Sequence, residues 1–242
     1  MVRLTIDGKV VEAKKGTSIL HAAESVGIKI PTLCYIKDLL PDGSCRMCMV
    51  EIENRGRTKM ETACTAQVAE GLVVTTNSEK VRNARRNILD MLLSNHKTDC
   101  FSCPSNGDCK LQELCFEYGI ERTTYSGEQT ELPIDDSNKF FTYNPNLCIL
   151  CHRCVNTCHK IVGRGAIDTM ERGFDSAIGT PFHIDWADTN CESCGNCVQA
   201  CPTGALTMKR RKNYRKYQID KKVLTTCPHC ATGCQYYLLV KD

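Results

Sequence analysis

The stretch CILCHRCVNTC at residues 148–158 decides the fold, because it returns as CESCGNCVQAC at residues 191–201. Each copy spaces four cysteines as C-x2-C-x2-C-x3-C, and each leads through a Gly-Ala step into a short apolar run. A loop with two-residue gaps can wrap three corners of one cubane cluster. The fourth thiolate stands a helical turn further on and points toward a neighbouring cluster.

This spacing is typical of bacterial ferredoxins with two [4Fe–4S] clusters, in which the fourth cysteine of each run binds the other cluster. A ferredoxin-like domain is therefore predicted over residues 138–210. Zinc is the alternative, although zinc sites usually combine two separated C-x2-C pairs. One cluster is expected on Cys148, Cys151, Cys154 and Cys201, and the other on Cys158, Cys191, Cys194 and Cys197.

An earlier cysteine group follows a hairpin and a helix. Residues 2–15 alternate loosely around Asp7-Gly8, which is a hairpin signal, and Thr17 can cap a helix that Gly27 ends. These elements suit a β-grasp [2Fe–2S] domain over residues 1–77, although the C-x10-C-x2-C-x15-C spacing departs from that of plant ferredoxins. Taken alone, the spacing also fits a pair of zinc knuckles. The expected ligands are Cys34, Cys45, Cys48 and Cys64.

A third group combines a histidine with three cysteines in a small helical domain over residues 78–120. Its members are His96, Cys100, Cys103 and Cys109, spaced H-x3-C-x2-C-x5-C. Cys115 competes with His96 as the fourth ligand, but it lies within the helical sequence CKLQELC and is predicted to be a buried free thiol. A neutral imidazole in place of a thiolate makes such a [4Fe–4S] cluster easier to reduce.

The helix that precedes this group is predicted from about Ser78 to Ser94. Its apolar stripe is expected to comprise Val81, Ala84, Ile88, Met91 and Leu92. Three arginines, Arg82, Arg85 and Arg86, are placed mostly on the other faces. They are interpreted as a solvated surface, with a partner or cluster-edge contact as the alternative.

Two polar or incomplete segments remain. Residues 121–137 are rich in turn-forming residues and are predicted to be a linker. Residues 211–242 form a tail in which Cys227, Cys230 and Cys234 lack a fourth ligand. The tail is expected to hold a further [4Fe–4S] cluster or a zinc ion if His229, Cys115 or a partner completes the set.

Composition separates metal proteins from disulfide scaffolds. Nineteen cysteines in 242 residues, with no leader-like start and no long apolar run, predict a cytoplasmic metal protein without a transmembrane segment. The formal charge of +3 counts every cysteine as a thiol. Four bound clusters would add a charge of about −7, which would bring the net charge of the loaded protein to about −4. The formal positive charge is therefore no argument for nucleic acid as a partner.

No recognisable site for a substrate or a nucleotide accompanies these cysteines. There is no G-x-G-x-x-G opening a helix, no P-loop and no nucleophile–base motif of a hydrolase. The sequence therefore predicts a carrier of redox cofactors with no catalytic residue of its own.

The order of these groups resembles the N-terminal iron–sulfur region shared by the complex I large iron–sulfur subunit, [FeFe] hydrogenases and NAD-linked formate dehydrogenases. The resemblance covers roughly residues 1–210 and rests on four motifs in one order, ending CPTGAL. The tail TTCPHCATGCQ resembles the opening of a molybdopterin oxidoreductase domain, where a later fourth cysteine completes another [4Fe–4S] cluster. The implied fold class is α+β.

The resemblance also implies a function. It suggests an iron–sulfur electron-transfer subunit of a soluble, flavin-based electron-bifurcating complex. The implied partners are a flavoprotein that binds NAD(H) or NADP(H), ferredoxin and a further iron–sulfur subunit. A second hypothesis is the electron-transfer portion of a molybdenum or tungsten formate dehydrogenase. A third, a zinc-rich interaction or nucleic-acid module, predicts a colourless protein.

Overall fold

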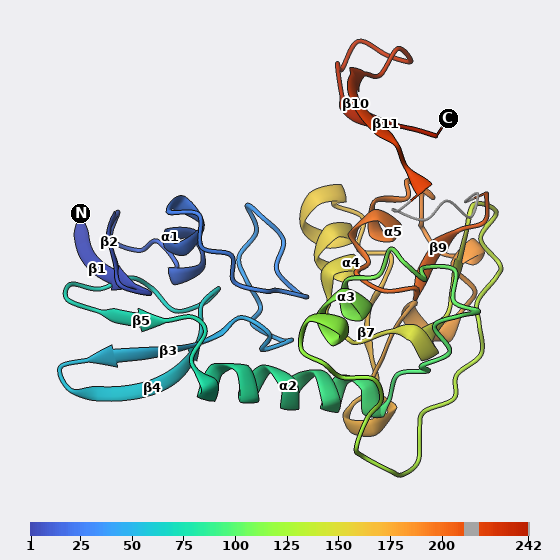
Figure 1. Ribbon diagram of the computed structural model, residues 1–242. Helices are drawn as coiled ribbons and strands as arrows, with labels where there is room; N and C mark the ends of the chain where they lie inside the picture. Colours follow the sequence, from blue (N-terminus) through green and yellow to red (C-terminus); the bar gives the residue numbers. More distant parts are fainter. Residues whose placement is uncertain (211–217, 242) are drawn as a thin grey trace.

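The computed structural model describes residues 1–210 and 218–241 as a mixed α and β structure with two lobes. Figure 1 shows the first lobe in blue and cyan and the second lobe in green to orange, joined along one side by a long helix, α2 (Glu79–Ser94). None of the described helices is long and apolar enough to cross a membrane.

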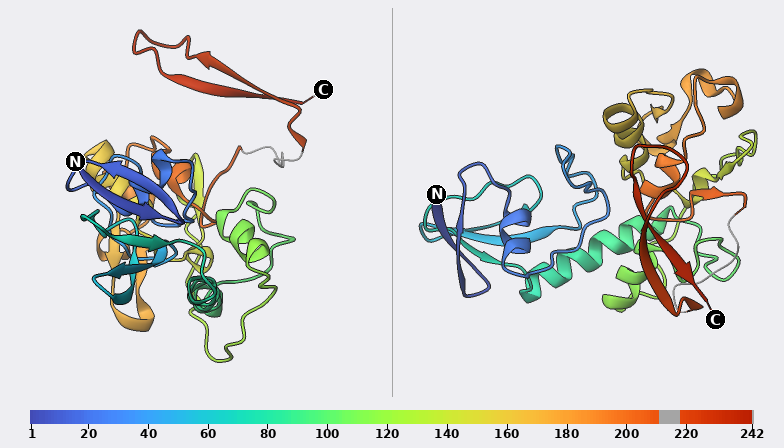
Figure 2. Two further views of the ribbon diagram at one scale, coloured as in Figure 1. Left: turned by 60° about the vertical axis from the view of Figure 1, so that its left-hand side comes forward. Right: turned by 90° about the horizontal axis from the view of Figure 1, so that it is seen from above.

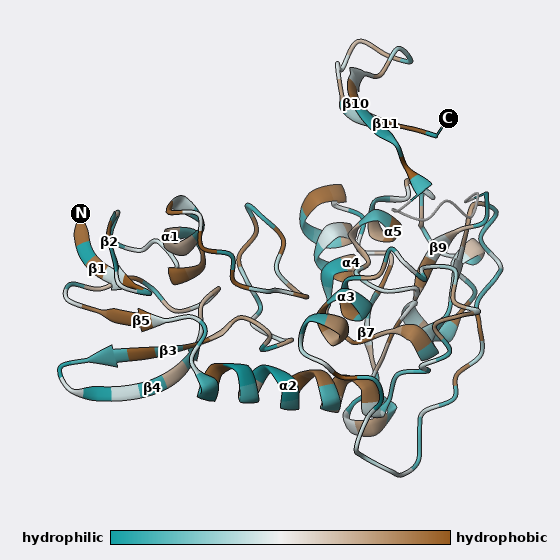
Figure 3. Ribbon diagram, viewed as in Figure 1, coloured by the Kyte–Doolittle hydropathy of each residue, from teal (hydrophilic) through white to brown (hydrophobic). Residues whose placement is uncertain are grey.

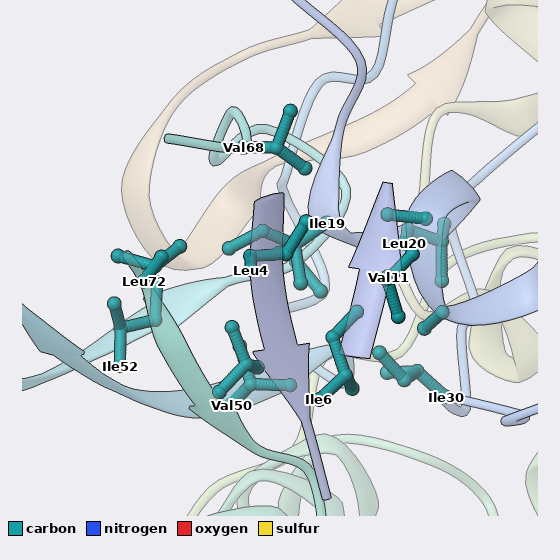
Figure 4. Close-up of a cluster of buried hydrophobic side chains, with 14 of the residues drawn as sticks. Leu4, Ile6, Val11, Ile19, Leu20, Ile30, Val50, Ile52, Val68 and Leu72 are labelled. Atoms are coloured by element: carbon teal, nitrogen blue, oxygen red, sulfur yellow. The ribbon is translucent and has the colours of Figure 1, made fainter. Parts of the chain in front are cut away.

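The first lobe is a five-stranded mixed sheet with a short helix packed on it. The strand order is β2-β1-β5-β3-β4, and only the β1–β5 pair is parallel. Alternate strand residues such as Leu4, Ile6 and Val50 face Ile19 and Leu20 of the helix in one apolar core (Figure 4). The elements are β1 (Val2–Ile6), β2 (Lys9–Ala13), α1 (Ile19–Ser25), β3 (Met49–Asn54), β4 (Arg57–Thr62) and β5 (Val73–Thr75).

The predicted hairpin is confirmed, whereas the predicted helix cap is wrong by one residue. Asp7 and Gly8 have φ of 47° and 78°, the two positive values of a tight two-residue turn between β1 and β2. Ser18 caps α1, its Oγ accepting a 3.3 Å hydrogen bond from His21 N. Thr17 lies one residue too early, since its N–H donates to Lys14 O in the preceding turn.

Helix α2 begins where it was expected, but its buried face is different. Ser78 caps it, with Oγ accepting a 3.2 Å hydrogen bond from Val81 N. The expected stripe is confirmed in part: Val81 is buried, Ile88 and Leu92 are partly buried against the core, and Met91 is 54% exposed. Figure 3 shows brown, hydrophobic residues concentrated toward the end of α2 near the second lobe. The buried residues are Val81, Arg85, Leu89 and Leu93.

Arg85 occupies a core position because its guanidinium donates to two acceptors on different segments. It is 3% exposed. Its Nη2 donates a 2.7 Å hydrogen bond to Met49 O, and its Nη1 donates a 3.0 Å bond to the Tyr118 hydroxyl. Arg85 thus ties the start of β3, one residue after Cys48, to the segment that follows α3 (Lys110–Glu117). The interpretation of this arginine as part of a solvated surface is wrong.

Replacing Arg85 by Ala is expected to lower the free energy of unfolding by about 2–4 kcal/mol. The change leaves the Met49 carbonyl buried without its donor and opens space between the lobes. Arg86→Ala is the matched control, because Arg86 Nη1 donates a 2.7 Å bond to Tyr118 O at an exposed position. The control should change stability by about 0.5 kcal/mol or less. Anaerobic urea unfolding of the iron-loaded protein measures both, and equal effects would contradict the structural role of Arg85.

The second lobe consists of short helices and two-stranded pairs around an aromatic core. Trp186 stacks on Tyr143 at 5.3 Å between ring centroids and meets Phe141 edge-on at 5.0 Å. Strand β6 pairs with β9, and β7 with β8. Besides α3, the elements are β6 (Phe141–Tyr143), η1 (Pro145–Leu147), α4 (Arg153–Asn156), η2 (Thr157–Val162), β7 (Asp168–Met170), η3 (Gly173–Asp175), β8 (Ala177–Gly179), η4 (Pro181–His183), η5 (Trp186–Asp188), α5 (Asn196–Ala200) and β9 (Leu206–Met208).

The segment 121–137 is irregular, as its composition predicted, but it is fastened to α2 by polar contacts. The Asp90 carboxylate accepts hydrogen bonds from the hydroxyls of Thr123 and Thr124 at 2.7 and 2.5 Å. The Asn95 side chain exchanges hydrogen bonds with Thr130 at 3.0 and 2.8 Å. These contacts hold the segment along the helix.

The tail forms a hairpin that stands away from both lobes. Its strands are β10 (Lys221–Thr226) and β11 (Gln235–Val240), paired antiparallel over their full length. Figures 1 and 2 show it, in red, projecting beyond the rest of the chain. Several of its apolar side chains are exposed, among them Leu224, Tyr237, Leu238 and Leu239.

Candidate metal centres

All nineteen cysteines, each among the described residues, carry free thiols. Sixteen predicted ligands, fifteen of them cysteines, form four groups in the two lobes. The sheet site is Cys34, Cys45, Cys48 and Cys64, and the histidine site is His96, Cys100, Cys103 and Cys109. Ferredoxin site A is Cys148, Cys151, Cys154 and Cys201, and ferredoxin site B is Cys158, Cys191, Cys194 and Cys197.

The sheet site is assembled in loops at one end of the first-lobe sheet, and all four of its cysteines are buried. The Cys45 thiol donates to Cys34 and holds the pKa of Cys34 at about 5. The Sγ atoms of Cys48 and Cys64 share a 3.3 Å hydrogen bond. A thiolate at Cys34 also raises the pKa of Cys64, after the larger effects of the Cys48 hydrogen bond and burial. The four cysteines thus form two hydrogen-bonded pairs, Cys34 with Cys45 and Cys48 with Cys64.

At the histidine site, a buried imidazole lies directly after α2. Burial lowers the pKa of His96 to about 4, so its ring is neutral at pH 7, which is the form that a metal ligand requires. Its Nδ1 atom is buried and has no hydrogen-bond partner among the described residues. An unpartnered buried nitrogen is costly in an apolar setting, and coordination to iron would remove that cost.

Cys115 lies close to the histidine site. A cavity of about 380 Å³ is lined by His96, Cys100, Cys109 and Cys115, with Leu93, Leu111 and Phe116 among its other walls. Burial raises the pKa of Cys115 to about 11, and the charges of Cys109 and Cys100 add to the shift. The structure thus brings both candidate fourth ligands to one cavity.

At both ferredoxin sites, cysteines of one run lie near cysteines of the other run. The pKa values of Cys148 and Cys151 are both raised to about 12, mainly by burial, and the charge of Cys201 contributes to both shifts. Burial likewise raises the pKa of Cys197 to about 12, with added effects of Cys191, Cys194 and Cys158. Cys201 therefore stands beside the first run and Cys158 beside the second, although each belongs to the other run in sequence.

The sequence repeat is also a repeat of backbone conformation. Leu150 and Ser193, each two residues after the first cysteine of its run, have φ of 50° and 54°, and their N–H groups donate to the Sγ atoms of Cys148 and Cys191 at 3.4 Å. His152 and Gly195 have φ of 57° and 76° at the next matched position. These left-handed residues turn backbone donors toward sulfur, which stabilises thiolates. Leu150 and His152 take the conformation without being glycine.

The histidine site and ferredoxin site A are in direct contact through a glycine. A Cβ placed on Gly204 would lie 2.7 Å from Cys103 Sγ. Nearby, Lys110 N donates a 2.9 Å hydrogen bond to Pro202 O, and Ser105 Oγ a 3.5 Å bond to Thr203 O. The loop that carries Cys103 is therefore seated on the segment that follows Cys201.

One apolar cluster joins three of the sites. It contains Cys34 and Cys45 of the sheet site, Cys151 of ferredoxin site A, and Leu89 and Leu111 from the helices beside the histidine site. Such continuity removes water from the space between the sites. The structure thus packs separate ligand groups around one core.

The tail cysteines stand apart from these groups. Cys227 N donates a 2.8 Å hydrogen bond to Cys234 O at the base of the loop that joins the two strands, and the Cys230 thiol lies 3.3 Å from Thr232 Oγ1. Cys230 and Cys234 are exposed, and His229 stands between Cys227 and Cys230. Cys115 lies in the apolar cluster and is not brought to this hairpin.

The donor sets suit iron–sulfur clusters. Among the described residues, no three or more His, Cys, Asp or Glu side chains are close enough to hold a single metal ion. Buried thiols with backbone donors, and the unpartnered nitrogen of His96, match the ligands that such clusters use.

Comparison with protein families divides the chain in the same order. Residues 1–79 match a 2Fe-2S iron-sulfur cluster binding domain, and residues 85–124 match the NADH-ubiquinone oxidoreductase-G iron-sulfur binding region. Residues 140–207 match the ferredoxin-like domain of NADH-quinone oxidoreductase subunit 3, and residues 190–237 match a 4Fe-4S dicluster domain. The chain therefore contains a [2Fe–2S] domain and ferredoxin-like [4Fe–4S] domains.

Curated relatives are longer proteins. The alpha subunit of the NADPH-Fe(3+) oxidoreductase of Geobacter sulfurreducens is 43% identical over 97% of this chain and 27% of its own length. The NADP-reducing hydrogenase subunit HndD of Solidesulfovibrio fructosivorans is 39% identical over 85% of this chain and 36% of its own length. The chain thus spans about a quarter to a third of these two relatives.

A solved structure matches over nearly its whole length. A chain in the crystal structure of an NAD+-reducing [NiFe]-hydrogenase superposes with a TM-score of 0.79 and 30% identity, covering 86% of this chain and 88% of that one. Together with the match of residues 85–124, this shows that the chain belongs to the family of iron–sulfur proteins that unites the iron–sulfur subunits of NADH-quinone oxidoreductases with those of NAD(P)-linked hydrogenases.

Proposed function

We propose that this chain conducts electrons among one [2Fe–2S] and three [4Fe–4S] clusters within an NAD(P)-linked oxidoreductase complex. The observation that carries the proposal is the apolar cluster that packs Cys34, Cys45 and Cys151 together with helices α2 and α3. Sites that share a dry core are suited to short electron steps between them. The proposed ligands are the sixteen residues of the sheet site, the histidine site and ferredoxin sites A and B.

In this proposal the protein holds the clusters, shields them from water and sets their reduction potentials. When bound, the clusters supply reversible one-electron chemistry. Backbone donors such as Leu150 N and Ser193 N stabilise charge on sulfur, and they favour the reduced state. Neutral His96 at the histidine site lowers the negative charge there and acts in the same direction.

The electron donor in this proposal is a flavoprotein partner that binds NAD(H) or NADP(H). The sequence has no nucleotide-binding motif of its own, while the two curated relatives are an NADPH-linked and an NADP-reducing protein. We further propose that ferredoxin and another iron–sulfur subunit are partners and that the complex is of the electron-bifurcating type. A molybdenum or tungsten formate dehydrogenase is the alternative complex, favoured by the tail motif of residues 227–234.

The first test is the iron, sulfide and zinc content of the anaerobically purified protein. About 14 iron per chain without zinc is expected for the four clusters. About 18 iron would add a fifth cluster at Cys227, Cys230 and Cys234 with a borrowed ligand, and about 14 iron with one zinc would make the tail a zinc site. Zinc with almost no iron contradicts the electron-transfer proposal.

Partner identity needs a second measurement. A flavoprotein recovered with the chain should reduce its clusters when NADH or NADPH is added, and ferredoxin should exchange electrons with the same complex. Reduction by formate, together with molybdenum or tungsten in the complex, would favour the alternative. Bifurcation is rejected if ferredoxin reduction does not depend on a second, higher-potential acceptor.

A further inference from the structure

The guanidinium of Arg153 joins backbone segments that are far apart in sequence. Its Nη1 donates a 2.6 Å hydrogen bond to the carbonyl oxygen of Tyr35, and its Nε donates a 2.6 Å bond to the carbonyl oxygen of Ala200. Both bonds are short and charge-assisted, which makes them stronger than neutral ones. A planar guanidinium can serve two acceptors in fixed directions, whereas a lysine acts as a point charge.

Both acceptors stand next to proposed cluster ligands. Tyr35 directly follows Cys34 of the sheet site, and Ala200 directly precedes Cys201 of ferredoxin site A. The Ala200 carbonyl also ends α5, where helix carbonyls lack partners within the helix and favour a cation. One side chain therefore fixes the backbone at a ligand of each of two sites.

Arg153 itself belongs to the loop of ferredoxin site A. It stands between Cys151 and Cys154 and is the first residue of α4. Its Nε lies 2.6 Å from the carbonyl oxygen of the residue before Cys201, so the guanidinium charge stands between two ligand-bearing segments of this site. A cation in that place favours extra negative charge on the site.

We propose that Arg153 is a positioning residue that sets the separation between the sheet site and ferredoxin site A and raises the reduction potential of the cluster at site A. The inference rests on the proposed function only in requiring that both sites hold clusters. The contact geometry gives the first role, and the position of the charge within the ligand loop gives the second.

A neighbouring ion pair supplies the matched control. Lys160 Nζ lies 3.8 Å from Asp42 Oδ1 and so also links the first-lobe loop to the segment after α4. Both side chains are partly exposed, and exposed pairs contribute little to stability. Lys160→Ala removes a cation from the same junction without breaking a hydrogen bond to a carbonyl beside a ligand of the sheet site or of ferredoxin site A.

The test uses the iron-loaded chain, with Arg153→Gln, Arg153→Lys and Lys160→Ala. Two readouts are taken in the dithionite-reduced protein: the enhancement of [2Fe–2S] spin relaxation by the neighbouring [4Fe–4S] cluster, and the midpoint potential of the site A cluster. Hydrogen exchange in residues 34–40 reports the loop directly. Arg153→Gln should weaken the relaxation enhancement, lower the midpoint potential and speed this exchange roughly tenfold or more.

Arg153→Lys separates the two roles. Lysine keeps the positive charge but lacks the planar guanidinium that reaches both carbonyl oxygens. The midpoint potential should therefore stay near the wild-type value, while the enhancement of spin relaxation should fall. Lys160→Ala should change neither readout. Wild-type coupling and potential in an iron-replete Arg153→Gln protein overturn the inference, and so does an effect of equal size in Lys160→Ala.

If Arg153→Gln loses iron, Arg153→Lys decides: unchanged coupling overturns the positioning role, and weakened coupling supports it. Failure of the proposed function is seen separately. It would appear as missing iron, or as absent reduction by NAD(P)H through a partner, in the wild-type protein itself.

Discussion

Replacing Cys201 by Ser is expected to remove the [4Fe–4S] cluster of the other run, with loss of about four iron atoms per chain. Cys201 lies in the second run, but its charge acts on Cys148, Cys151 and Cys154 of the first. A site left with three thiolates and a weakly binding hydroxyl loses its cluster. Iron content and the electron paramagnetic resonance spectrum of the reduced protein measure the loss.

Double variants decide which ligands share a cluster. Cys148→Ser with Cys201→Ser should lose no more iron than either change alone, because both disable site A. Cys191→Ser with Cys201→Ser should lose about eight iron atoms, because two clusters are affected. The opposite pattern would assign Cys201 to its own run. Cys115→Ser is the control for cysteine replacement in the core and should keep all of the iron.

The second large effect concerns the histidine site. His96→Ala is expected to release about four iron atoms, since the proposed ligand set is then reduced to Cys100, Cys103 and Cys109. His96→Cys should restore the cluster but lower its potential, on the order of 100 mV or more, because a thiolate adds negative charge where imidazole adds none. Redox titration followed by electron paramagnetic resonance measures the shift.

Cys115 makes this prediction open to refutation. It lines the same cavity as His96, so a cluster ligated by Cys115 would survive His96→Ala and be lost in Cys115→Ser. That outcome would assign the orphaned Nδ1 of His96 to some other partner. Retention of iron in both single variants would mean that either residue can serve as the fourth ligand.

Much of what could be predicted followed from the spacing of particular residues along the chain. The runs at 148–158 and 191–201 indicate tight loops, and the matched positive φ values of Leu150 and Ser193 agree with such loops. Asp7-Gly8 predicted a hairpin because few residue pairs accept two positive φ values. The α2 boundary followed from Ser78, whose hydroxyl is a local signal. Features of this kind depend on neighbours within a few residues.

What could not be predicted depends on contacts between distant segments. The core position of Arg85 is set by acceptors on Met49 and Tyr118, neither of which is visible in the helix pattern. Ser18 and Thr17 are equally good caps by composition, and the preceding turn chooses between them. The link from Arg153 to Tyr35 spans 118 residues. The burial of Cys115 was expected, but its place beside His96 was not.

Gly204 shows how one domain can limit the variation of another. Its backbone is not in the left-handed region where glycine is favoured, so the turn itself would accept alanine; the obstacle is Cys103 Sγ, 2.7 Å from where a methyl group would stand. In an isolated ferredoxin-like domain, which lacks Cys103, other residues could replace Gly204. In the whole chain, a side chain at position 204 would displace a proposed ligand of the histidine site, so the loop that carries Cys103 limits what can stand after Cys201.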